Sequence, residues 1–181
     1  VGHGAGAGSY LHANDLGSYN TVSASGATAI GYNNTSGGGN SSTLGYYNKA
    51  NYAGSTALGN DNRAYNASAT AVGFQNAAWG ISSTAVGSNN AVVGDYGSAL
   101  GYRNNVYSTN GNAIGYKNTA GAFGLGTTND NAVGSGNSAT GGGSSAFGDG
   151  NTASGQDSSA LGFFNDASGL KSTAVGYSNT A

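Results

Sequence analysis

A unit of fourteen residues repeats along almost the whole chain, and no other sequence feature restricts the fold as strongly. The first half of the unit, for example TAVGSNN, contains a Thr, Ser or Asn, usually Ala, a bulky aliphatic residue, Gly, two variable residues and Asn. Copies begin at Thr28, Ser42, Thr56, Thr70, Thr84, Ser98 and Asn112, and then at Asn131, Ser145, Ser159 and Thr173. Such periodicity predicts a repeat protein, in which each unit packs on its neighbours.

The repeat also defines the domain organisation. Residues 1–13 fit the period poorly, and we interpret them as an irregular N-terminal segment or cap. Residues 14–181 are predicted to form a single repeat domain that starts with a degraded copy at Asn14. The spacing from Asn112 to Asn131 is nineteen residues, which places an insertion near residues 121–130. We expect this insertion at a turn, where solenoids usually carry them.

The composition is unusual but does not indicate disorder. The chain has 35 glycines among 181 residues, about three times the usual share, and only 7% charged residues. Such values are typical of flexible linkers, but here the glycines occupy fixed repeat positions and tyrosines are plentiful. The net charge of −2 offers no basic surface for nucleic acid. No apolar run is long enough to span a membrane, and the first residues show no signal-peptide pattern.

The length of the repeat selects the class of solenoid. Fourteen residues are too few for a pair of helices, and a Gly in each unit is unfavourable inside a helix. Each unit instead divides into two halves, each with a few extended residues and a turn. The sequence therefore predicts an all-β fold, a parallel β-solenoid of about twelve fourteen-residue coils that stack at the inter-strand spacing of about 4.8 Å.

Strand alternation sorts the repeat positions by face. Ala71 and Gly73 share one face of the first half, and Ala78 and Gly80 share one face of the second. If these faces meet inside the coil, the interior holds little beyond methyl groups and hydrogens. Alternation alone leaves the reverse arrangement open, with the aliphatic residues inside.

In the first arrangement the aliphatic residues form an outward row, which we call the aliphatic row. An apolar surface of this extent marks an interface, so we predict that the row is a trimer or assembly interface. Its members are Ile30, Leu44, Leu58, Val72, Val86, Leu100, Ile114, Val133, Phe147, Leu161 and Val175.

Each copy closes its first half with an asparagine. Asn tolerates left-handed backbone and bonds to neighbouring backbone in turns, and stacked Asn amides can form ladders. Neutral amides are poor metal ligands without carboxylates beside them, so we predict a structural ladder and no metal site. The predicted ladder comprises Asn34, Asn48, Asn62, Asn76, Asn90, Asn104, Asn118, Asn137, Asn151, Asn165 and Asn179.

The repeat resembles the YadA-like head of trimeric autotransporter adhesins, whose unit follows an A-I-G-x-x-[SN]-x-A-x-G pattern. The segments that carry the resemblance include Ala29–Gly31, Ala85–Gly87, Ala113–Gly115 and Ala174–Gly176. This resemblance implies a left-handed parallel β-roll, three chains packed side by side, and exposure on a bacterial cell surface where the head binds host matrix or other cells. Similar repeats occur in phage tail fibres.

Catalytic chemistry has little support in the sequence. Both histidines, His3 and His12, lie in the irregular N-terminal segment. Asp149, Asp157 and Asp166 lie at predicted turn positions of consecutive coils, where they could bind calcium, but we favour the simpler interpretation as solvated turn residues. We therefore predict no enzyme activity, no catalytic residues and no cofactor.

The leading functional hypothesis is an extracellular adhesin head at the bacterial cell surface. Tyr65, Trp79 and Tyr107 form its candidate ligand-contact face, directed at a host matrix protein or a surface glycan. The alternative is the subunit of a self-assembling extracellular filament or phage tail fibre, because unpaired β edges template association. An ice-binding solenoid that uses the row of Thr56, Thr70 and Thr84 is a remote third hypothesis.

Overall fold

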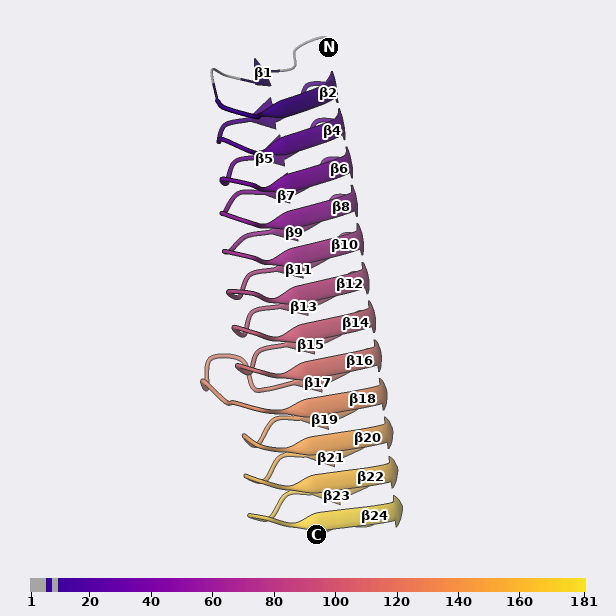
Figure 1. Ribbon diagram of the computed structural model, residues 1–181. Coiled ribbons are helices and arrows are strands. Elements are labelled where there is room, and N and C mark those ends of the chain that lie inside the picture. Colours follow the sequence, from indigo (N-terminus) through magenta and orange to yellow (C-terminus); the bar gives the residue numbers. More distant parts are fainter. Residues whose placement is uncertain (1–5, 8–9) are drawn as a thin grey trace. The chain divides into compact units, whose positions relative to one another are not determined.

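A computed structural model describes residues 6–7 and 10–181 of the chain. The chain forms two compact units, residues 1–89 and 90–181, which are built in the same way. Each fourteen-residue repeat supplies a five-residue strand and a two-residue strand with a turn after each (Figure 1). No helix occurs in the described ranges, and the predicted all-β parallel solenoid is confirmed.

The first unit contains a sheet of long strands and a sheet of short strands. Its long strands are β2 (Asn14–Ser18), β4 (Thr28–Tyr32), β6 (Ser42–Tyr46), β8 (Thr56–Asn60), β10 (Thr70–Phe74) and β12 (Thr84–Ser88). Its short strands are β1 (Gly6–Ala7), β3 (Thr21–Val22), β5 (Thr35–Ser36), β7 (Lys49–Ala50), β9 (Arg63–Ala64) and β11 (Ala77–Ala78). Strand β1 therefore lies within the N-terminal segment that was expected to be irregular.

The second unit repeats this arrangement. Its long strands are β14 (Ser98–Tyr102), β16 (Asn112–Tyr116), β18 (Asn131–Ser135), β20 (Ser145–Asp149), β22 (Ser159–Phe163) and β24 (Thr173–Tyr177). Its short strands are β13 (Ala91–Val92), β15 (Asn105–Val106), β17 (Thr119–Ala120), β19 (Ser138–Ala139), β21 (Thr152–Ala153) and β23 (Asp166–Ala167).

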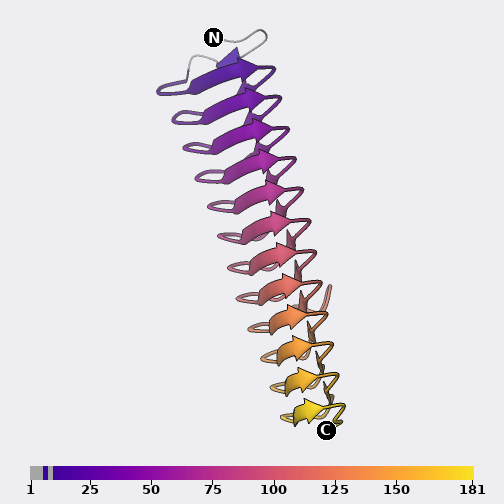
Figure 2. The same cartoon turned by 90° about the vertical axis from the view of Figure 1, so that its right-hand side faces the viewer.

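Parallel pairing joins identical repeat positions of successive coils. Thr70 pairs with Thr84, and Gly73 pairs with Gly87, so a side chain at one position lies beside its equivalent in the next coil. Figure 2 shows the long strands following one another in this way, with turns at both edges. Because the register is exact from coil to coil, the repeat converts each sequence position into a column of similar side chains.

The alanine faces lie inside the coils. Ala71 and Ala85 of the long strands and Ala78 of a short strand are fully buried. Of the two arrangements that alternation left open, the structure therefore has the alanines inside and the aliphatic residues outside. The expectation that the interior holds little beyond methyl groups and hydrogens is wrong, however. The interior also buries the turn asparagines, serines such as Ser55 and Ser83 just before the long strands, and valines such as Val92.

The glycine of the long strand is required by both backbone geometry and space. Gly73 has φ +120°, a conformation that L residues rarely adopt. A Cβ atom on Gly73 would also overlap the carbonyl oxygen of Gly87 in the next coil. Successive coils can therefore approach to the sheet spacing only where this position lacks a side chain.

The five extra residues of the chain, 122–126, leave the second unit as a loop between β17 and β18 (Figure 1). On its far side the regular pattern resumes at once, because Asn129 N–H donates to the Thr109 carbonyl and Thr109 N–H donates to that of Thr127. The exposed side chains of Phe123 and Leu125 form the apolar tip of the loop. The coil is thus complete without the insertion.

Deleting residues 122–126 is expected to leave a folded protein with an unchanged or higher thermal unfolding midpoint. The deletion restores the fourteen-residue period, and a shorter loop loses less entropy on closure. Circular dichroism melting measures the effect. Deleting residues 112–116 from the same coil removes a strand of equal length and should unfold the region; equal losses in both variants would contradict this account.

Candidate interaction surfaces

The turn asparagines form a ladder of amides inside each unit. In the first unit it runs from Asn20 to Asn76, and in the second from Asn90 to Asn179, one asparagine per coil. Each Nδ2 donates to the Oδ1 of the preceding asparagine at 3.0–3.2 Å. The backbone N–H of each donates to the same Oδ1, as from Asn62 to Asn48 at 3.1 Å. The amide therefore replaces backbone pairing at a turn that would otherwise leave buried polar groups.

The ladder is also tied to both neighbouring strands. Nδ2 of Asn62 donates to the carbonyl of Leu58 in its own coil at 2.9 Å and to that of Gly73 in the next coil at 2.7 Å. Gly73 is the residue with φ +120°, and this backbone conformation directs its carbonyl to the amide. The Asn and Gly of the repeat thus act together.

Two departures from the repeat place carboxylates among these hydrogen bonds. In the degraded first copy Asp15 stands where most other copies have Ala, and its carboxylate accepts a hydrogen bond of 3.0 Å from Nδ2 of Asn20. At the insertion Asp130 takes the place of the buried serine, and its Oδ1 accepts from Gly142 N–H, Ser144 N–H and Ser144 Oγ–H. Only the pairing of the coils reveals these partners, since Asp130 and Ser144 lie in different repeats.

The aliphatic row faces outward from the long strands of each unit. In the first unit Leu44 is 50% exposed, and the remaining members are half-buried. In the second unit Leu100 is 50% and Leu161 is 49% exposed, and only Val133 falls in the half-buried range. Their neighbours along the column are other members of the row, as Leu100 beside Ile114. Each unit therefore presents a continuous column of outward-facing apolar side chains.

The candidate ligand-contact residues lie on the outer side of the short-strand sheets. In the first unit the rings of Tyr65 and Trp79 contact each other with centroids 4.5 Å apart, and Trp79 is 47% exposed. In the second unit Tyr107 packs edge-on against Phe123 of the insertion, with centroids 5.3 Å apart. Phe123 of the same unit therefore covers part of the Tyr107 ring. The position of Tyr107 in the repeat did not predict this contact.

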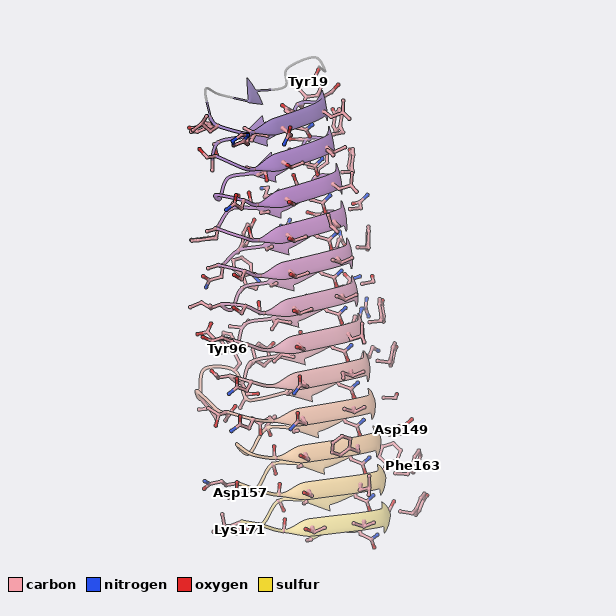
Figure 3. The ribbon with its side chains drawn as sticks, in the orientation of Figure 1. Tyr19, Tyr96, Asp149, Asp157, Phe163 and Lys171 are labelled. Carbon is pink, nitrogen blue, oxygen red and sulfur yellow. The ribbon has the colours of Figure 1, made fainter. Side chains whose placement is uncertain are left out.

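Tyrosines also gather at the turn edge that follows the long strands. In the first unit Tyr32 and Tyr46 stack, and Tyr19 and Tyr47 pack against them. Figure 3 shows Tyr19 at this edge, and Phe163 at the corresponding edge of the second unit. Partial burial of Tyr46, together with the adjacent Tyr47 and Tyr32, raises the pKa of its phenol.

The acidic residues that suggested a calcium site do not form one cluster. Asp149 ends a long strand, whereas Asp157 lies in the turn after a short strand, and Figure 3 shows them at opposite edges of the second unit. Among the described residues no group of three His, Cys, Asp or Glu side chains could hold a metal ion. That part of the molecule also contains no helix long and apolar enough to cross a membrane. Of the two histidines, His12 is exposed and His3 lies outside the described residues.

Comparison with known proteins identifies the repeat. The family model described as the YadA head domain repeat (2 copies) matches residues 53–76, 64–90, 78–104, 139–165 and 167–181. These segments together cover slightly more than half of the chain, and they include long strands, short strands and turns of both units. No curated protein matches the sequence.

Proposed function

The chain belongs to the YadA head domain repeat family, and on this premise we propose that it is the head of a trimeric adhesin on a bacterial cell surface. The family consists of bacterial surface adhesins, which associate as homotrimers and act by binding. For this chain the proposal assigns assembly to the aliphatic row and ligand contact to the outer side of the short-strand sheets. It includes no catalytic role.

The exposure of the aliphatic row carries the proposal. Apolar surfaces of this continuity are uncommon on monomeric proteins and mark interaction sites. In the second unit Leu100, Ile114, Phe147, Leu161 and Val175 each expose more than a third of their surface on one face. Burying such a face supports association by about 25 cal/mol for each Å² of apolar surface removed from water. Packing of three chains along their rows meets this requirement.

The repeat chemistry fits close packing of chains along this face. On the outer side of a long strand, the aliphatic residue lies between a Thr, Ser or Asn at the start of the strand and the residue after the Gly. Short polar side chains beside the row, such as Ser98 and Thr84, do not hold partners apart. The ion pair Arg63–Asp61 does not involve the row.

Replacing Leu100 by Asp is expected to convert the trimer to monomers, because each chain would bury an unpaired carboxylate in the apolar interface. Sedimentation equilibrium measures the mass of the assembly. Val93→Asp is the matched control, since Val93 is a 43% exposed aliphatic residue of the same unit on the short-strand side. The control should remain a trimer. A monomeric wild-type protein, or a trimeric Leu100→Asp variant, would refute the assignment of the row, and growth of the wild-type protein without limit would favour the filament.

Ligand binding is proposed for the face that contains Tyr65 and Trp79. Exposed aromatic residues often dominate the binding energy of protein interfaces, and this pair combines ring contact with exposure. Trp79→Ala should weaken adhesion of the trimer to purified matrix proteins or surface glycans while leaving the assembly mass unchanged. Adhesion that survives in a folded Trp79→Ala trimer would place the ligand elsewhere on the head.

A further inference from the structure

Two tyrosines of the first unit are held side by side by the sheet register. Tyr32 ends β4 and Tyr46 ends β6, and the two residues are direct partners in the parallel pairing of these strands. Their rings are stacked, with centroids 5.3 Å apart and planes only 11° from parallel. Because the residues are identical and in register, the two phenol rings lie next to each other along one column.

Both rings are exposed to solvent and free to reorient. Tyr32 is 40% and Tyr46 is 47% exposed. Exposed side chains reorient on the picosecond to nanosecond scale, so the ortho carbons can approach each other repeatedly. The backbone around them is fixed, since Tyr47 N–H donates to the Tyr32 carbonyl at 3.0 Å. The arrangement holds two phenols at high effective concentration without joining them.

We propose that Tyr32 and Tyr46 form an oxidative modification site that yields an intramolecular dityrosine. A peroxidase with hydrogen peroxide as oxidant removes one electron and the phenolic proton from each tyrosine. The two radicals couple through a new ortho C–C bond, the two ring hydrogens leave as protons, and the phenols are restored. Two hydrogens are lost overall, and the peroxide is reduced to two molecules of water.

A second stacked pair in the other unit differs in its charges. Tyr102 and Tyr116 also stack in register, with centroids 5.7 Å apart and planes at 19°. However, the Arg103 guanidinium lies 5.1 Å from the centre of the Tyr102 ring, and the Lys117 ammonium lies 5.0 Å from that of Tyr116. A cation over a ring opposes removal of an electron from it. The first unit has no such cation on its pair among the described contacts, so coupling is selective for Tyr32 and Tyr46.

The closest pair in the cluster is not the coupling pair. Tyr46 and Tyr47 have centroids 4.4 Å apart, but their planes cross at 57°, so the two rings are tilted and not stacked. Tyr47 is also held with φ +58° in the turn, directly bonded to Tyr46. The bond between Tyr32 and Tyr46 instead links successive coils and closes a fourteen-residue loop. Like other cross-links, it restricts the unfolded chain and raises thermal stability.

Peroxidase and hydrogen peroxide treatment of the dilute protein tests the proposal. The fraction that remains a single chain on a denaturing gel should show dityrosine fluorescence, an intact mass lower by two hydrogens, and a higher thermal unfolding midpoint than the untreated protein. Tyr32→Phe and Tyr46→Phe should each abolish this product, because phenylalanine forms no phenoxyl radical. Tyr47→Phe and Tyr52→Phe, which keep the stacked pair, should retain it.

Three results would overturn the proposal. The first is a single-chain fraction that keeps its starting mass, with all coupling found in cross-linked dimers or trimers. The second is loss of the single-chain product in Tyr102→Phe and not in Tyr32→Phe, which would move the site to the second unit. The third is loss in Tyr47→Phe with retention in Tyr32→Phe. Each Tyr→Phe variant keeps its aromatic ring, so loss of folding does not obscure the outcome.

Discussion

Replacing Asn62 by Ala is expected to destabilise the first unit by about 3–5 kcal/mol, one of the two largest effects of any single substitution proposed for this protein. Asn62 is fully buried. Its Nδ2 donates to Asn48 Oδ1, the Leu58 carbonyl and the Gly73 carbonyl. Its Oδ1 accepts from the backbone and side chain of Asn76. Alanine removes all these bonds at once.

The size of the effect follows from the groups that remain. A buried donor or acceptor left without a partner costs about 1–3 kcal/mol, and the Asn76 backbone N–H and the Gly73 carbonyl both lose a hydrogen bond. Denaturant and thermal unfolding followed by circular dichroism measure the loss. Asn60→Ala is the matched control, because Asn60 is exposed at the end of β8 in the same coil. Similar midpoints for the two variants would show that the ladder does not stabilise the fold.

Gly134→Ala is expected to prevent the coils of the second unit from stacking at this level, with a loss of at least about 3 kcal/mol. Gly134 has φ +120°, which is strained for any L residue. The added Cβ would overlap the carbonyl oxygen of Gly148 and lie 3.0 Å from Nδ2 of Asn137. Relief requires separation of β18 from β20 at the position where the ladder also binds.

Another glycine of the same coil provides the control. Gly136 also has a positive φ, +64°, but a Cβ there would meet nothing closer than the Gly150 backbone nitrogen at 4.0 Å. Other coils place Asn33 and Lys117 at this position with φ of 53° and 54°. Gly136→Asn should therefore unfold within a few degrees of the wild-type protein, while Gly134→Ala melts far lower. Equal tolerance at both positions would refute the argument from space.

The fold was predictable because one short unit is copied many times. A single TAVGSNN segment is ambiguous, but the same positions recur in each coil, and the fourteen-residue spacing excludes helical repeats. The strands and their parallel register follow directly, since stacking copies of one unit pairs each position with itself. The special roles of the glycine and asparagine positions could be predicted because both residues recur at the same place in each coil.

The residues that fill the interior, and the contacts between columns, were harder to predict from the sequence. The sequence did not reveal that Ser55 and Asn62 are buried in the interior of the first unit as fully as Ala57, because polar residues at turns usually face water. The partners of Asp130 and the contact of Tyr107 with Phe123 join residues from different repeats or from the insertion, where periodicity carries no information. The opposite placement of Asp149 and Asp157 also depends on which turn each residue occupies.

The sequence by itself determined the period, the strands, the coil-to-coil register and the family, because these depend on local backbone preferences copied at constant spacing. Only the tertiary structure decided which face is interior. Alternation divides a strand into two faces without ranking them, and the ranking depends on how the long and short strands of a coil pack: Ala71 and Ala78 are fully buried there, whereas Val72 stays half-buried on the outer face. The aliphatic side chains are consequently placed outside, where each unit presents them to a partner.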